Sequence, residues 1–321
     1  MGLSSVLLWI VSGCVGFVRS ILVGSSGLKT PRVMLAALPD LLRYGLLRFR
    51  EHFLPFLSSR SASPAPPKSD PLPRATASTL DTRTFVSVII PAFNEGEGIV
   101  KTVRSALLTG LRPMPVEVIV VDGGSTDGTR EAAAIAGAKV IEGPSGRAQC
   151  LNAGAAASMG DILLFIHGDT VLPDGFGGAL REALSMGGVP KSADLFSSTR
   201  GRIDDRCADL AAFSLKLEPQ LPFLFVVETL ANVRSRIFGL PFGDQGLAMR
   251  REVFEALGEF PLQPLLDDLS LVEEARRRGA VVTLRESVVS SSRPPPPSHA
   301  KYKTSGSRNQ EPSSPSLPTA F

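Results

Sequence analysis

The 321-residue chain has few of the residues from which disulfide frameworks, zinc sites and nucleic-acid surfaces are built. Its three cysteines, Cys14, Cys150 and Cys207, lie far apart without CxxC spacing. We therefore expect neither a disulfide framework nor a zinc site. Aromatic residues make up 6% of the sequence and do not interleave with the arginines. Because the net charge is also only +3, nucleic acid is not an expected partner.

The first 57 residues form an apolar and amphipathic segment. Residues 6–18 are almost wholly apolar, but this run is short for a membrane span, which needs about 17–25 residues, and no basic residue precedes it. Residues 33–57 alternate apolar pairs with arginines, as is typical of a helix lying in a membrane interface. We therefore expect association with a membrane through residues 1–57. An organelle transit peptide, and an ordinary docking helix of a soluble cytoplasmic protein, are the alternatives.

Two other segments are rich in proline and serine. Residues 58–83 are expected to form a linker, and residues 291–321 a disordered tail, because neither has enough apolar residues to offset the entropy of ordering. Between them, residues 84–290 are long and apolar enough for one folded domain.

Within this domain, predicted strands and helices alternate. Strands are expected at Val86–Ile90, Val116–Val121, Lys139–Ile141 and Ile162–Ile166, with helices at 97–108, from Asp127 as N-cap to Ala136, and at 146–158. This order predicts an α/β fold with a mostly parallel, doubly wound sheet. Residues 185–209 are expected to be an irregular insertion. The remaining predicted elements are strands at 212–217 and 281–284 and helices at 228–237, 251–257 and 269–278.

Polar residues follow several strands, where an open α/β sheet binds its ligand. Phe93 and Glu95 follow the first strand, and Asp122 and Asp127 lie in the loop after the second. Arg147 opens a predicted helix, and an arginine at a helix N-terminus can bind an anion, although an exposed surface arginine would fit equally.

Acidic residues occur at two further positions. Asp169 follows the strand at 162–166, next to His167; a carboxylate at a strand tip can ligate a hard cation, or it can simply form a turn. Asp267 and Asp268 precede a predicted helix, where they could cap it or provide a general base. Asp244 and Gln245 lie between glycines, in either a tight turn or a ligand-binding loop.

Six ordered motifs together resemble the family 2 glycosyltransferases, which have the GT-A fold. The motifs are IIPAFNE, VVDGGSTDGT, GRAQCLNAGA, GDILLFIHGDT, FGDQG and LLDDLSL, and the resemblance covers about residues 84–293. The final two motifs, with the sequence around them, are most similar to a subgroup labelled arsenosugar-biosynthesis-like glycosyltransferases.

The resemblance implies a metal-assisted, inverting transfer of a sugar from a nucleotide-sugar to an acceptor hydroxyl, with Mg²⁺ or Mn²⁺ as the metal. Asp268 would be the catalytic base, and Asp169 would bind the metal with His167, which stands where the family has an acidic residue. The implied donor-binding residues are Phe93, Glu95, Asp122, Asp127, Arg147, Asp244 and Gln245.

Two alternatives remain open at this point. A polyprenyl-phosphate sugar synthase would use a membrane lipid as acceptor, which the apolar N-terminus favours. A catalytically degenerate domain that only binds nucleotide-sugars is suggested by His167. A Rossmann oxidoreductase is not expected, because PAFNEGEG after the first strand lacks the GxGxxG motif.

Overall fold

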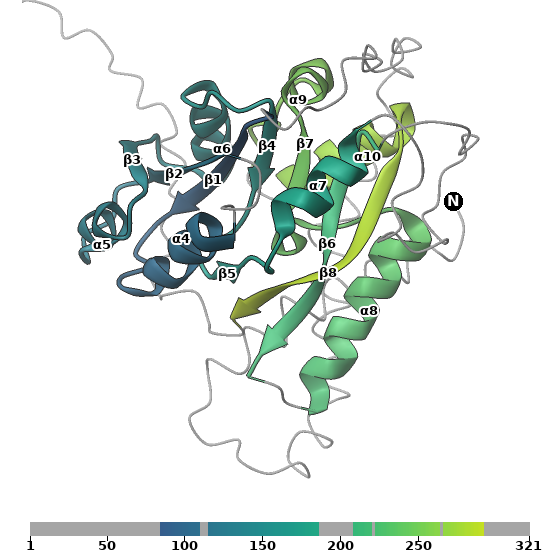
Figure 1. The fold of residues 1–321 in the computed structure, drawn as a ribbon, viewed down its shortest axis with the longest axis horizontal. Helices are drawn as coiled ribbons and strands as arrows, with labels where there is room; N and C mark the ends of the chain where they lie inside the picture. Colours follow the sequence, from purple (N-terminus) through teal and green to yellow (C-terminus); the bar gives the residue numbers. More distant parts are fainter. Residues whose placement is uncertain (1–83, 110–114, 186–207, 220–221, 264–265, 292–321) are drawn as a thin grey trace, which may run out of the picture.

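The computed structural model describes residues 84–109, 115–185, 208–219, 222–263 and 266–291 (Figure 1). The expected segments 1–57 and 58–83, nearly all of the tail and most of the insertion at 185–209 lie outside these residues. In the described part of the chain, no helix is long and apolar enough to cross a membrane.

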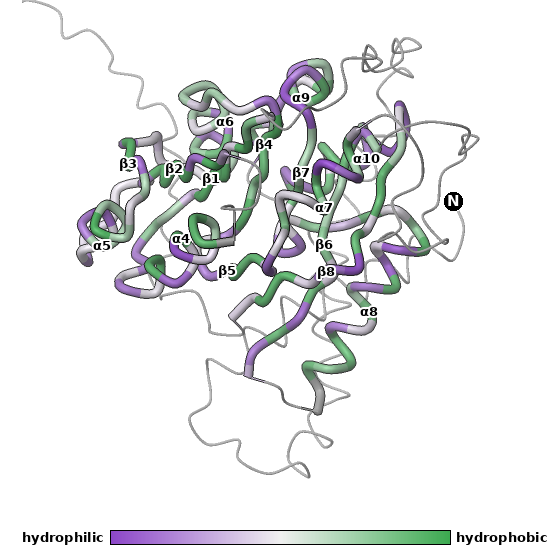
Figure 2. The backbone as a smooth tube through the Cα atoms, in the orientation of Figure 1, coloured by the Kyte–Doolittle hydropathy of each residue, from purple (hydrophilic) through white to green (hydrophobic). Residues whose placement is uncertain are grey.

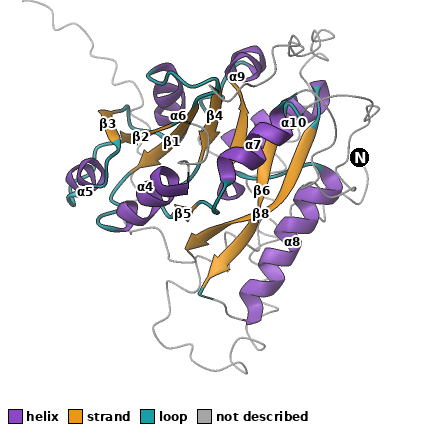
Figure 3. Cartoon of the chain, in the orientation of Figure 1, coloured by secondary structure: helices purple, strands orange, loops and turns teal. Residues whose placement is uncertain are grey.

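The described elements build one α/β domain around a single sheet (Figure 3). The strands are β1 (Val86–Ala92), β2 (Val116–Asp122), β3 (Lys139–Glu142), β4 (Ile162–Phe165), β5 (Thr170–Val171), β6 (Leu210–Glu218), β7 (Leu247–Arg250) and β8 (Val281–Ser291). The helices are α4 (Gly98–Thr109), α5 (Thr129–Ile135), α6 (Arg147–Ala156), α7 (Phe176–Leu184), α8 (Pro222–Phe238), α9 (Arg251–Leu257) and α10 (Asp267–Arg278), with a short 3-10 turn at Gly243–Gln245.

The eight-stranded sheet has the order β3-β2-β1-β4-β7-β6-β8-β5. Strands β3, β2, β1 and β4 are parallel; β7 is antiparallel to both β4 and β6, and β5 is antiparallel to β8. Since β6 and β8 are parallel to each other, only β7 and β5 run against the common direction. The predicted mostly parallel sheet is therefore confirmed.

Alternate strand residues pack into two separate cores, one on each face of the sheet. Val88 and Ile90 of β1 pack in a core with α4, α5, α7 and α8. Ile89, between them, packs in a second core with α6, α9 and α10. Because β1 is covered on both faces, its sequence is a continuous apolar run, which is why it could be recognised as a strand.

Helix α6 lies unusually close to the sheet, and Gly154 explains why. A Cβ atom at this position would lie 2.4 Å from Cγ2 of Ile89 and 2.9 Å from Cγ2 of Val121. A glycine is therefore needed where α6 crosses β1 and β2.

Several local predictions differ from the structure. Helix α5 begins at Thr129, with Gly128 rather than Asp127 as its N-cap. Strand β7 and helix α7 were not predicted: β7 has only four residues, and the glycines at 175, 177 and 178 obscured the helical pattern of α7. The turn Gly243–Gln245 consequently lies between a helix and a strand and not, as expected, between two helices.

We predict that Phe254→Ala lowers the free energy of unfolding by about 3–5 kcal/mol, because a buried aromatic ring would be replaced by a cavity. Phe254 is 2% exposed, and its ring centroid lies 5.0 Å from that of Phe165 and 5.7 Å from that of Phe260. Urea denaturation measures the loss. As the control, Leu108→Ala at a 67% exposed position should change the free energy by less than about 0.5 kcal/mol. Equal losses in the two variants would contradict this core assignment.

Candidate functional site

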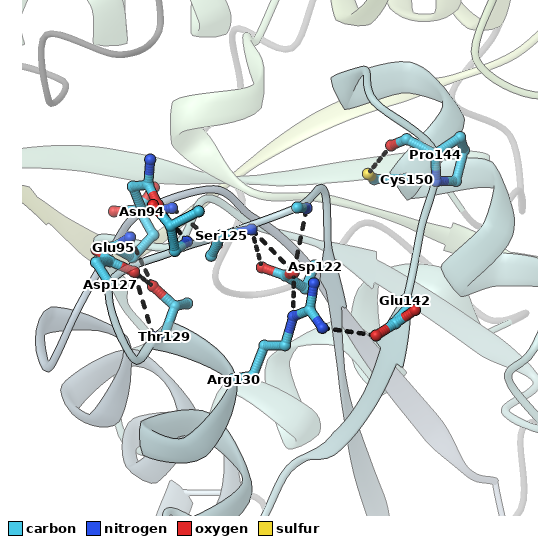
Figure 4. Close-up of polar contacts among 12 residues, drawn as sticks. Asn94, Glu95, Asp122, Ser125, Asp127, Thr129, Arg130, Glu142, Pro144 and Cys150 are labelled. Carbon is cyan, nitrogen blue, oxygen red and sulfur yellow. Dashed lines mark hydrogen bonds and ion pairs between the residues drawn. The ribbon is translucent and has the colours of Figure 1, made fainter.

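The loop after β2 is organised around the buried carboxylate of Asp122 (Figure 4). Its oxygens accept hydrogen bonds from the backbone N–H groups of Gly124 (3.1 Å) and Ser125 (3.0 Å) and from Nε of Arg130 (2.6 Å). Burial acts to raise the pKa of Asp122, but the bonds from Ser125, Arg130 and Gly124 outweigh it and lower the pKa below its ordinary value. Asp122 therefore holds the loop in shape.

Arg130 completes this arrangement, although it was not among the predicted site residues. Its Nη1 lies 2.6 Å from Oε1 of Glu142, at the end of β3, so one guanidinium joins the ends of β2 and β3. Nothing in the spacing of residues 122, 130 and 142 predicts this contact, because it depends on the parallel pairing of the two strands.

The loops after β1 and β2 are joined by short polar contacts. Ser125 Oγ accepts a hydrogen bond from the backbone N–H of Asn94, and Asn94 Oδ1 accepts one from the N–H of Thr126, each at 2.9 Å. Thr129 Oγ1 accepts one from the N–H of Glu95 at 3.0 Å and donates to the carboxylate of Asp127 (Figure 4). The two loops thus form one rigid platform.

This platform also contacts the end of β4. Gly168 packs so closely against the half-buried Glu95 that a Cβ atom there would lie 2.9 Å from Cγ of Glu95. Gly168 stands between His167 and Asp169, the two predicted metal ligands. The structure therefore brings the candidate nucleotide-binding loops next to the candidate metal-binding turn.

Arg147, the first residue of α6, lies at the centre of a charged cluster. Its Nε is 3.3 Å from Oδ2 of Asp267, its Nη2 is 3.2 Å from Oδ2 of Asp268, and its Nη1 is 3.2 Å from Nε2 of His167. About a third of the Arg147 side chain is exposed, so the guanidinium can reach a ligand while it holds the acids. Of the two readings, a surface arginine and an anion site, this geometry favours the second.

Asp268 is fixed from several sides. It accepts hydrogen bonds from the N–H groups of Gly243 and Leu269, both at 2.8 Å. Burial acts to raise its pKa, but Arg147, the Gly243 N–H and His167 outweigh burial, so the pKa of Asp268 is lowered. At Asp267 burial prevails over Arg147, with a smaller contribution from Asp268, and raises the pKa. The lowered pKa favours the ionised form of Asp268, which is the form that can accept a proton.

Gln245 has a structural role. It is fully buried: Nε2 donates to the carbonyl of Phe213 (3.0 Å), and Oε1 accepts from Arg234 Nη2 and the N–H of Phe242, both at 3.3 Å. The Arg234 guanidinium also stacks 3.5 Å above the ring of Phe242. Gln245 therefore shapes the turn that presents Gly243 to Asp268, with Asp244 half-buried beside it.

The metal ligands predicted from the sequence, His167 and Asp169, stay a prediction. In the described residues no group of three or more His, Cys, Asp or Glu side chains is placed to hold an ion by itself. His167 and Asp169 provide one imidazole and one carboxylate from the same turn. The carboxylate suits Mg²⁺ or Mn²⁺, whereas imidazole is more typical of softer metals, and Nε2 of His167 already lies 3.2 Å from Nη1 of Arg147, so diphosphate oxygens would have to supply most of the ligands.

Sequence comparisons match part of the chain. Residues 87–189 match the family model described as "Glycosyl transferase family 2", so the predicted family is confirmed for this segment. The chain is 40% identical over 101 residues to a glucosyl-3-phosphoglycerate synthase of Mycolicibacterium smegmatis, covering 28% of this chain and 32% of that protein. It is 38% identical over 95 residues to the glycosyltransferase AglE of Haloferax volcanii, covering 27% and 31%. The matches thus span about a third of the length of these relatives.

Solved structures show a weaker likeness. A mannosyltransferase from Pyrobaculum calidifontis in complex with GDP-Man and Mn²⁺ is 20% identical, with a TM-score of 0.46 over 74% of this chain and 63% of that one. TarS of S. aureus in complex with UDP-GlcNAc is 16% identical, with a TM-score of 0.49 over 68% and 61%. At these values the likeness carries no functional weight.

We predict that Asp122→Asn lowers the free energy of unfolding at pH 7, because the carboxylate bonded to Arg130 is lost. The folded-state pKa of Asp122 lies below its ordinary value of 3.8, so its contribution is present above that value and is lost as the pH falls through the folded-state pKa. Urea unfolding at a series of pH values should therefore show the difference from the native chain shrinking below pH 3.8.

The matched control is Asp174→Asn, which removes an exposed carboxylate and should change stability by less than about 0.5 kcal/mol. A difference between Asp122→Asn and the native chain that stayed constant from pH 7 to pH 3 would show that the ionised carboxylate is not what holds the loop.

Proposed function

We propose that the chain is an inverting glycosyltransferase that moves a sugar from a nucleotide-sugar donor to an acceptor hydroxyl. One observation carries the proposal: Asp268, a carboxylate held ionised, lies 3.2 Å from the Arg147 guanidinium at the N-terminus of α6. A general base therefore stands directly beside a site for an anion, as a displacement that releases a diphosphate requires. The family match over residues 87–189 supports the same reaction class.

In the proposed step, the acceptor hydroxyl gives its proton to Asp268 as its oxygen bonds to the anomeric carbon. The bond from that carbon to the diphosphate oxygen breaks, and the nucleoside diphosphate leaves with the electron pair. Arg147 neutralises part of the charge that develops on it. The N–H groups of Gly243 and Leu269 keep Asp268 in position throughout.

The donor half of the site is proposed to be the platform formed by the loops after β1 and β2. Phe93 and Glu95, both half-buried, would contact the base and ribose of the nucleotide. Asp122 and Asp127 would act through the loop that they hold, since both bond to neighbouring residues of that loop. Asp244 would line the side toward the donor sugar and the acceptor.

A divalent cation, when bound, would neutralise charge on the diphosphate, and His167 with Asp169 would hold it. Mn²⁺ and Mg²⁺ are both cations that a carboxylate suits, so both are to be tested. The predicted arsenosugar-like subgroup stays a prediction.

We predict that Asp268→Asn retains donor binding but lowers the turnover number by about 10²–10⁴-fold, since the proton acceptor is removed while its shape is kept. Calorimetry measures donor binding, and nucleotide release over a panel of UDP- and GDP-sugars with hydroxyl acceptors measures turnover. Asp174→Asn, at an exposed position in the loop before α7, should have the same turnover number as the native chain. Full activity of Asp268→Asn would remove it as the base, and a native chain that binds no donor would overturn the proposed function.

We also predict that chelation by EDTA abolishes nucleotide release and that Mn²⁺ or Mg²⁺ restores it. Asp169→Asn should raise the Mn²⁺ concentration needed for half-maximal rate by about tenfold or more, because one of two protein ligands is weakened. Asp161→Asn, which alters a carboxylate at the other end of β4, should leave this concentration unchanged. Unaltered activity in EDTA would contradict a metal-assisted reaction.

A further inference from the structure

Helix α8 has five exposed apolar side chains on the side opposite to the one that packs in the core. Phe225, Val226, Leu230, Val233 and Ile237 are 61%, 54%, 38%, 41% and 49% exposed. Their spacing places them along one side of four helical turns, and the only other exposed residue between 224 and 238 is Thr229. This set of five, the outer face of α8, therefore carries no charged residue.

The polar side chains of α8 are used inside the protein. Asn232 bonds to both the N–H and the carbonyl of Leu215 on β6, at 2.8 and 2.9 Å, and Glu228 accepts a bond from the N–H of Leu217. Arg236 donates to Ser214 Oγ at 2.9 Å. These contacts replace a neighbouring strand along β6, because the pairing of β6 with β7 covers only residues 210–212.

The other polar groups of the helix are satisfied in the same way. Ser235 bonds to Thr283, Arg234 donates to the carbonyl of Leu240, and the Thr229 hydroxyl donates back to the carbonyl of Phe225. These polar side chains therefore do not depend on water at the outer side of the helix. A surface helix normally has its charged residues on that side. Figure 2 shows hydrophobic and hydrophilic residues alternating along α8, and Figure 1 places the helix beside β6 and β8 at the margin of the domain.

We propose that the outer face of α8 docks on an anionic lipid membrane. A charge-free strip on a helix whose polar groups are already bonded suits burial at the boundary between headgroups and acyl chains. The lipid membrane is favoured over a second copy of the chain by the apolar and arginine-containing sequence of residues 1–57, and the test below distinguishes the two occupants.

The chain outside the described residues supplies the second membrane signal that stable anchoring requires. Residues 6–18 are apolar, and Arg43, Arg48 and Arg50 interrupt the apolar sequence of residues 33–57. Basic residues next to apolar ones attract anionic lipids. The face on α8 would then fix how the domain sits on the surface, whichever reaction the domain performs.

The direct test places a fluorophore on the face of the full-length chain. Trp9 is the only tryptophan, so Phe225→Trp in a Trp9→Phe background reports on this position alone. With phosphatidylglycerol-containing vesicles we expect a blue shift of its emission and quenching by brominated acyl chains. The matched control, Ile135→Trp in the same background, is at an 83% exposed position on α5 and should show neither.

A second variant tests the energetics. Leu230→Glu with Val233→Glu should lower the fraction of full-length chain that pellets with these vesicles by about tenfold, because two charges would have to enter the lipid boundary. Ile135→Glu with Leu108→Glu adds the same charge elsewhere and should leave pelleting unchanged. Circular dichroism verifies that each variant is folded.

Several results would overturn the proposal. The proposal fails if the full-length chain pellets with the vesicles without quenching of the Phe225→Trp emission, and it fails equally if the chain does not pellet. Sedimentation equilibrium could reveal a dimer that the two glutamates dissociate, which would assign the face to a second copy. If deleting residues 1–57 shifted the emission of the tryptophan at 225 in the absence of lipid, the occupant would be the chain's own N-terminal segment.

Discussion

The contact on which the rest of the site depends is the guanidinium of Arg147 against Asp267, Asp268 and His167. It joins the first turn of α6, the turn after β4 and the first turn of α10, which are separated by up to 120 residues. Burial of an arginine with two acids is favourable only if every charge is paired and bonded. Asp268 meets this condition through the N–H groups of Gly243 and Leu269. The same cluster that is proposed to act in transfer therefore also joins elements from both halves of the sheet.

A second constraint acts through the loops after β1 and β2. Asp122, Arg130 and Glu142 connect the ends of β2 and β3, while Ser125 and Thr129 bond the backbone of residues 94–96. Each of these bonds joins one loop to another or to a strand end, so neither loop can move alone. Rigidity at this place favours binding, because less conformational entropy is lost when a ligand settles on it.

The parallel half of the fold could be predicted from the sequence because strands such as β1 are buried on both faces and therefore appear as continuous apolar runs. Strand β7 was not predicted, because its four residues are too few to show a pattern and its partners β4 and β6 are distant in the sequence. The same division holds for the site. Asp268 and Arg147 stand in motifs, but the roles of Arg130 and Gln245 follow from contacts that only the folded chain creates.

The reversed direction of β7 has a further consequence. In a sheet of parallel strands, the segments that precede each strand lie at the edge opposite the binding edge. Because β7 runs against β4, the turn Gly243–Gln245 that precedes it reaches the edge where β1, β2 and β4 end. One inverted strand therefore brings a segment that precedes a strand to the same edge as the segments that follow the parallel strands. A Cβ atom at Gly243 of this turn would lie 3.0 Å from Nε2 of His167 and 3.2 Å from Nη2 of Arg147, so the turn before β7 is packed against side chains from the turn after β4 and from α6 and cannot gain a side chain there without displacing them.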